Sequence, residues 1–185
     1  MPQKYDTASH WNEVLRGEFE KESDRAAVIL TVSIFEDALY RMLKNYLVAS
    51  TSSTDELLDG ANAPFSTFSA KITASHRLGL VSSKFCRDLH IIRRIRNEFA
   101  HNIHGCTFDN SAVRSRVLEI VKSSGIIERN PKTRATFPDG LRGDFLMCAS
   151  WMLYCLNQEI EEISPLDEAR KEWGYDKRHV EEADE

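Results

Sequence analysis

A stripe of polar side chains between residues 82 and 104 carries residue types suited to acid–base or anion chemistry. His90, Arg94, Asn97, His101 and His104 follow one another at steps of three or four, and side chains at these steps share one face of an α-helix. Imidazole titrates near neutral pH, and guanidinium stays charged and binds phosphate oxygens in pairs. The stripe has two interpretations: a solvated helix face, or an anion or phosphate site that a second subunit could complete.

The same segment reverses the sign of the chain's charge. From Lys84 to Arg96 it carries five basic side chains against one acid, Asp88, whereas the whole chain has a net charge of −5. The acidic total excludes a protein that coats nucleic acid through bulk charge, so any contact with RNA or DNA is expected to use this local basic patch. The candidates for binding an anion or nucleic acid are His90, Arg93, Arg94 and His104.

Arg96 is expected to point toward the core. Four apolar residues lie within about 60° of Ile92 on a helical wheel; they are Phe85, Leu89, Phe99 and Ile103. Arg96 lies at about 40°, inside this apolar stripe. An arginine cannot lose its charge, and burying it unpaired is costly. We therefore expect a structural ion pair between Arg96 and Glu36, with Asp37 as the second choice.

A metal site and a cofactor are not expected. Cys86 and His90 are spaced i, i+4, and His101, His104 and Cys106 are close in sequence. Zinc accepts these ligand types, but the spacing matches no familiar closed site, and thiols in apolar surroundings usually act as small hydrophobes. The sequence has no P-loop, no dinucleotide fingerprint and no Ser/His/Asp triad.

A short motif follows the basic patch. The segment Arg96-Asn97-Glu98-Phe99-Ala100-His101 resembles the Rx4-6H signature of the HEPN superfamily of helical domains. That resemblance implies a metal-independent endoribonuclease, a toxin or defence component, with its site across a homodimer. His101 would be the general acid or base, Arg96 would stabilise charge on the phosphate, and Asn97 would orient the pair. On a regular helix Arg96 and His101 lie about 140° apart, so one chain needs a bent or ended helix, or a second copy.

A longer stretch resembles the mannitol operon repressor (MltR) family. It runs from Leu57 to Val81, "LLDGANAPFSTFSAKITASHRLGLV", and continues through the helix that ends in "RNEFAHN". The resemblance implies an all-helical regulator without an obvious helix-turn-helix, acting by binding protein or nucleic acid, with no catalytic residue to carry over. We expect this regulatory function, with the HEPN-type ribonuclease as the alternative and a homodimer in either case.

Composition bounds the architecture. The chain has 185 residues, 42% hydrophobic and 29% charged, which suits one globular domain and excludes a disordered chain. No run of about 18 uncharged apolar residues is present, so no membrane span is expected. The four cysteines form no CxxC pair and no apolar signal segment opens the sequence, which favours reduced thiols and a cytoplasmic location.

Glycine and proline are rare, and the segments between them favour helices. The expected helices cover residues 8–21, 23–49, 66–79, 82–102, 109–125 and 145–163, with one helical turn at 54–60. No strand pairs are expected, so the fold class is all-α: a bundle of six to seven helices around the buried helix 23–49. Residues 128–143 are expected to form a long basic loop. The domain is expected to span 1–165, followed by a charged, flexible or partner-dependent tail at 166–185 that includes Trp173 and Tyr175.

Overall fold

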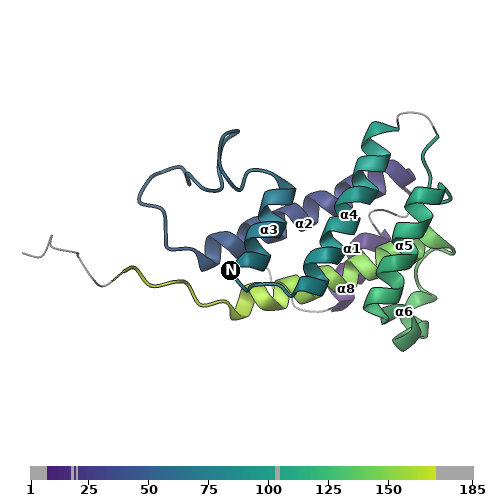
Figure 1. The fold of residues 1–185 in the computed structure, drawn as a ribbon. Coiled ribbons are helices and arrows are strands. Elements are labelled where there is room, and N and C mark those ends of the chain that lie inside the picture. The colour runs from purple at the N-terminus through teal and green to yellow at the C-terminus, as the bar shows by residue number, and fades with distance from the viewer. Residues whose placement is uncertain (1–7, 18, 20, 103–104, 170–185) are drawn as a thin grey trace, which may run out of the picture.

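The computed structural model describes residues 8–17, 19, 21–102 and 105–169. Within these ranges the chain forms eight α-helices and no strand (Figure 1). The helices are α1 (Ala8–Gly17), α2 (Asp24–Tyr46), α3 (Phe68–Arg77), α4 (Ser83–His101), α5 (Ser111–Ser124), α6 (Ile126–Arg129), α7 (Pro131–Arg134) and α8 (Leu141–Glu162). The expected all-α fold class is confirmed. His104, and Trp173 and Tyr175 of the expected tail, lie outside the described residues.

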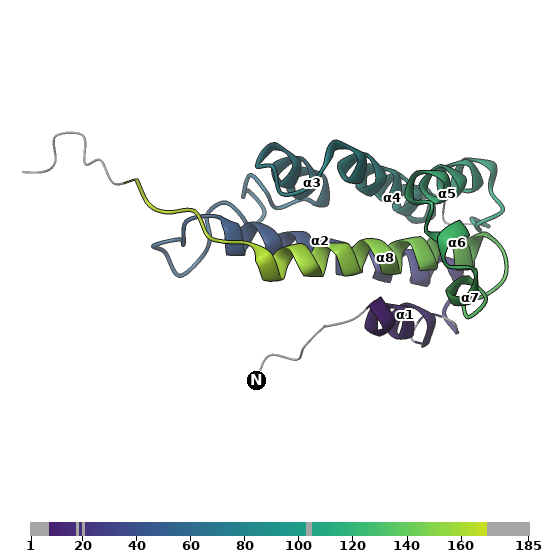
Figure 2. The ribbon, with the colours of Figure 1, turned by 90° about the horizontal axis from the view of Figure 1, so that it is seen from below.

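Helices α2 and α8 form the middle of three layers. Figure 2 shows them side by side, with α1 and α7 beneath and α3, α4 and α5 above. The two helices run parallel, because contacts join them at both ends. Near their starts, Arg142 Nη1 lies 3.2 Å from Asp24 Oδ1; past their ends, the Leu166 amide donates to the Tyr46 carbonyl at 2.8 Å. The expected central helix is therefore present, and α8 shares its position.

Local caps set the starts of the helices that carry the site. The side chain of Ser23 accepts from the Ala26 amide, that of Thr67 from the Ala70 amide, and that of Ser82 from the Phe85 amide. Each cap satisfies a backbone donor that the first turn leaves unpaired. These caps fix where α2, α3 and α4 begin. The first residues of α3 also form part of the wall of a cavity beside α4.

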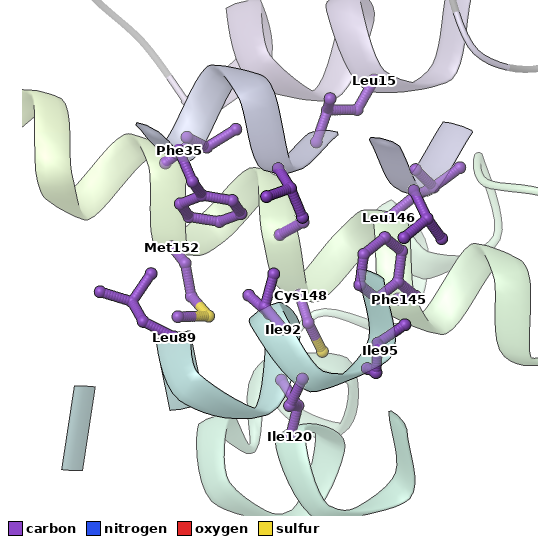
Figure 3. Close-up of a cluster of buried hydrophobic side chains, with 14 of the residues drawn as sticks. Leu15, Phe35, Leu89, Ile92, Ile95, Ile120, Phe145, Leu146, Cys148 and Met152 are labelled. Atoms are coloured by element: carbon purple, nitrogen blue, oxygen red, sulfur yellow. The ribbon is translucent and has the colours of Figure 1, made fainter. Parts of the chain in front are cut away.

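The core lies between the layers. Figure 3 shows side chains from α1, α2, α4, α5 and α8 meeting in one cluster. Members buried to 2% exposure or less include Leu15, Phe35, Ile92, Ile120 and Phe145. Helix α4 buries one side in this cluster against α2 and keeps contacts with α3 and α5 on its flanks. The cluster therefore holds α4 rigidly while its opposite side stays available.

The segment 128–143 differs from the expected loop. It contains the end of α6, all of α7 and the first turn of α8, which begins at Leu141. Two of its basic side chains are used internally: Arg134 Nε pairs with Asp144 Oδ1 at 2.6 Å, and Arg142 pairs with Asp24 and donates to the Glu22 carbonyl at 2.7 Å. The helices α6 and α7 have four residues each, too few for a hydrophobic period to reveal them.

No helix in the described ranges is long and apolar enough to cross a membrane. The expected domain boundary near residue 165 stays a prediction.

Candidate functional site

Helix α4 carries the predicted polar stripe on a surface that the bundle leaves uncovered. Its packing partners are α2, α3 and α5. Arg94 and His101 are exposed, and His90 and Asn97 are half-buried. Since these four residues lie at helical steps of three and four, the structure places them on one side of α4. The fifth member, His104, lies outside the described residues, so its predicted role in anion binding stays a prediction.

His90 has an environment that disfavours its charged form. Partial burial lowers the pKa of the His90 imidazole below its ordinary value, and the nearby positive charges of Arg93 and Arg94 lower the same pKa further. The folded protein therefore favours the neutral imidazole at this position. A neutral ring both donates and accepts hydrogen bonds, so it suits recognition of a polar partner group.

The expected ion pair between Arg96 and Glu36 is wrong. Arg96 is exposed, and Glu36 Oε1 lies 3.0 Å from Nζ of Lys71. Lys71 is 5% exposed and also donates to the Ser66 carbonyl at 2.9 Å. Thus α3 supplies the cation that neutralises Glu36.

The exposure of Arg96 follows from the place where α3 begins. Leu89, near Arg96 on the helical wheel, is fully buried, while Arg96, two turns later, is open to solvent. Helix α3 begins only at Phe68, and its first turn and Arg96 line the same cavity. A helical wheel gives the direction of a side chain but not the residue at which the neighbouring helix begins. Lys71 itself was detectable from sequence, because it follows Phe68 by three residues and therefore lies on the same, apolar side of α3.

A cavity of about 280 Å³ lies between α2, the first turn of α3 and α4. Its polar lining comes from all three helices and comprises Ser33, Glu36, Thr67, Ser69, Arg93, Arg96 and Asn97. Arg96 Nη1 makes a long contact of 3.4 Å with Asn97 Oδ1. Two of the residues predicted for catalysis, Arg96 and Asn97, are thus brought together with Arg93, which was predicted for anion binding.

His101 does not line this cavity. Helix α4 is continuous through His101, and the Asn102 amide still donates to the Glu98 carbonyl at 3.0 Å. Arg96 and His101 therefore keep the angle of about 140° that a regular helix imposes. One chain does not bring these two side chains to a common phosphate. The catalytic assignment of Arg96, Asn97 and His101 stays a prediction that requires a second copy.

Other residues of the "RNEFAHN" motif stabilise the end of α4. Glu98 Oε1 lies 2.8 Å from Arg116 Nη1 of α5, and Glu98 Oε2 accepts from Asn102 Nδ2 at 3.1 Å. Hydrogen bonds and the charge of Arg116 lower the pKa of the Glu98 carboxyl. Phe99 is buried against Phe108, with ring centroids 5.4 Å apart. Three of the seven residues of this segment, Glu98, Phe99 and Asn102, thus have a structural function.

The four thiols form no disulfide. Within the described ranges no group of three or more His, Cys, Asp or Glu side chains is arranged to hold a metal ion. All four cysteines are free. Burial raises the pKa of the Cys148 thiol to about 11, so this side chain stays protonated and packs as an apolar group.

Comparison with known proteins gives one structural similarity. No family model and no curated protein match the chain. The fold is similar to that of MtlR in the X-ray structure of the MtlR–HPr complex from Escherichia coli, with a TM-score of 0.56. The match covers 83% of this chain and 97% of that one, at 15% sequence identity. The helical architecture implied by the mannitol-repressor resemblance is confirmed; the chain is similar in fold to MtlR over most of both chains.

Proposed function

We propose that this protein is an MtlR-like cytoplasmic regulator that acts by binding a protein partner. The observation that carries the proposal is the fold similarity to MtlR, a protein whose structure is of a complex with HPr. The match covers nearly all of that chain, so the two helical folds correspond over most of their length. An HPr-like protein is therefore the first partner to test.

The polar stripe of α4 is the surface that we assign to this contact. It consists of His90, Arg94, Asn97 and His101, all on a helix whose other side is fixed in the core. A rigid surface loses little conformational entropy on association. Arg94 gives the stripe an exposed positive charge in a chain of net charge −5. A cationic patch of this kind favours an acidic surface on the partner and speeds association at low salt.

Calorimetric titration tests the proposal. HPr from the organism that encodes the chain is titrated into the wild-type protein, the Arg94→Glu variant and the Lys132→Glu variant. Lys132 is exposed on α7, which lies on the opposite side of the bundle from α4 (Figure 2), so it is the matched control. We expect saturable binding that Arg94→Glu weakens at least tenfold and that Lys132→Glu leaves unchanged, because reversing a charge in the contact places like charges together. Equal weakening by both variants would contradict the assignment to α4, and no binding by the wild-type protein would contradict the choice of partner.

The homodimer is part of the same proposal. Light scattering on the free protein and on the mixture reports the number of chains in each. A dimer that persists in the mixture places the chain–chain contact away from the α4 stripe, and a dimer that HPr dissociates places it on the stripe.

A further inference from the structure

The cavity between α2, α3 and α4 holds two arginines without acidic partners. Arg93 and Arg96 are three residues apart on α4, and both line the cavity. Neither forms an ion pair with any residue of the described chain. Nε of Arg93 is buried and has no hydrogen-bond partner in the same part of the chain. Two guanidinium groups that line one cavity repel each other, and a bound anion offsets that repulsion.

The acid in the cavity does not fill this role. Glu36 also lines the cavity, but its carboxylate pairs with the buried ammonium of Lys71 at 3.0 Å. Since Lys71 neutralises Glu36, the two arginines leave the cavity wall with two uncompensated positive charges. A phosphoryl group carries a charge between about −1.5 and −2 at neutral pH, which matches this excess.

The start of α3, where backbone amides are unpaired, also forms part of the cavity wall. Its wall includes Thr67, Phe68 and Ser69, the cap and first two residues of α3. The Thr67 hydroxyl accepts from the Ala70 amide, whereas the amides of Phe68 and Ser69 donate to no group of the described chain. Free first-turn amides and the positive end of the helix dipole favour anions. The donors therefore come from two helices, which suits a tetrahedral oxyanion better than a planar carboxylate.

We propose that this cavity binds a phosphoryl group through Arg93, Arg96 and the first-turn amides of α3, either as inorganic phosphate or on a small phosphomonoester. The volume of about 280 Å³ lies just below the usual range for pockets that bind drug-sized ligands, so the ligand is small. The site goes beyond the proposed partner binding, because its proposed ligands are Arg93, Arg96 and the start of α3, and it shares only Asn97 of its lining with the α4 stripe. It is tested on the isolated chain without HPr.

Titrations of the full-length protein at fixed pH and ionic strength test the site. The probes are inorganic phosphate, glycerol 3-phosphate and acetate, and the readouts are calorimetry and the amide chemical shifts of Phe68 and Ser69. We expect both phosphates, and not acetate at the same concentration, to shift these two amides saturably. Tighter binding of glycerol 3-phosphate than of phosphate assigns the site to a phosphomonoester, and the reverse order assigns it to free phosphate.

Matched substitutions locate the site. Arg96→Gln removes an exposed guanidinium and should weaken phosphate binding roughly ten- to hundredfold, the effect of losing a hydrogen bond to a charged group. Arg77→Gln is the control, because Arg77 is exposed at the far end of α3 and does not line the cavity. Melting temperatures of both variants verify folding. Acetate shifts equal to those of phosphate, no phosphate effect, or equal losses in Arg96→Gln and Arg77→Gln would each overturn the proposal.

Discussion

The pairing of Glu36 with Lys71 gives a quantitative prediction about stability. The Lys71 side chain is 6% exposed and that of Glu36 is 39% exposed. Glu36→Gln leaves the ammonium of Lys71 buried without a countercharge, whereas Lys71→Met leaves a carboxylate that water can reach. We therefore expect Glu36→Gln to lower the free energy of unfolding by about 1.5–2.5 kcal/mol. Lys71→Met should lower the free energy of unfolding less, by about 1 kcal/mol, since the apolar methionine side chain packs in the same buried space.

Two double-mutant cycles measured by urea unfolding separate Lys71 from Arg96 as the partner of Glu36. The first combines Glu36→Gln with Lys71→Met, and the second combines Glu36→Gln with Arg96→Gln. The 3.0 Å contact of Glu36 with Lys71 predicts a coupling energy of about 1 kcal/mol or more in the first cycle. Arg96 is exposed and makes no ion pair with Glu36 within the described ranges, so the second cycle should be additive within about 0.5 kcal/mol. A larger coupling in the second cycle than in the first would refute the structural account of the cavity.

Three further perturbations test separate parts of the structure. Gly143→Ala should lower the free energy of unfolding by about 2–3 kcal/mol, because a Cβ at Gly143 would lie 1.8 Å from the Pro138 carbonyl oxygen; chemical unfolding measures the loss. Lowering the pH from about 6.5 toward 5 should destabilise the wild-type protein more than His90→Gln, because the lowered pKa of His90 means that the unfolded chain binds more protons in this window. His101→Ala should change neither the melting temperature nor the behaviour toward RNA in EDTA, since His101 is exposed and lies apart from Arg96 on α4.

The Gly143→Ala variant has a matched control, and each of the three predictions has an outcome that would contradict it. Gly17→Ala is the control for Gly143→Ala, because nothing lies within 4 Å of a Cβ at Gly17. Equal stabilities of the two variants would show that residues 134–140 move away from the added Cβ without a cost in free energy. Identical pH profiles of the wild-type protein and His90→Gln would show that the pKa of His90 does not differ between the folded and unfolded states. Cleavage of RNA in EDTA that His101→Ala abolishes would establish the ribonuclease alternative and the use of a second copy.

Local sequence patterns predicted most helices of the fold correctly. Serine and threonine caps placed the starts of α2, α3 and α4 at or next to the observed residues, and Gly125 ends α5 with a positive φ of 60°. These features depend on neighbours within one turn, so a sequence contains them directly. The start of α8 was missed, because Gly140 and Gly143 suggested a loop. Gly143 instead lies inside the helix, where the Pro138 carbonyl approaches it closely, and such a tertiary approach has no local pattern.

The candidate site was predicted only in part. The direction of the α4 stripe follows from helical periodicity, and the structure places its described members on one side. The partner of Glu36 and the exposure of Arg96 depend on where α3 begins relative to α4, which is a property of packing. The cavity depends on the same relation, since its walls belong to three helices. Charge and residue type thus indicated anion chemistry at Arg93 and Arg96, while the fold determined which groups converge.

Mapping of HPr on the protein by amide chemical shifts tests the central claim most directly. Uniformly labelled protein is observed while unlabelled HPr from the same organism is added. A regulator that uses the α4 stripe predicts saturable shifts concentrated between residues 90 and 101, on the exposed side of α4. Spectra that stay unchanged at saturating HPr, or shifts confined to α1 and α7 on the opposite side of the bundle, would contradict it.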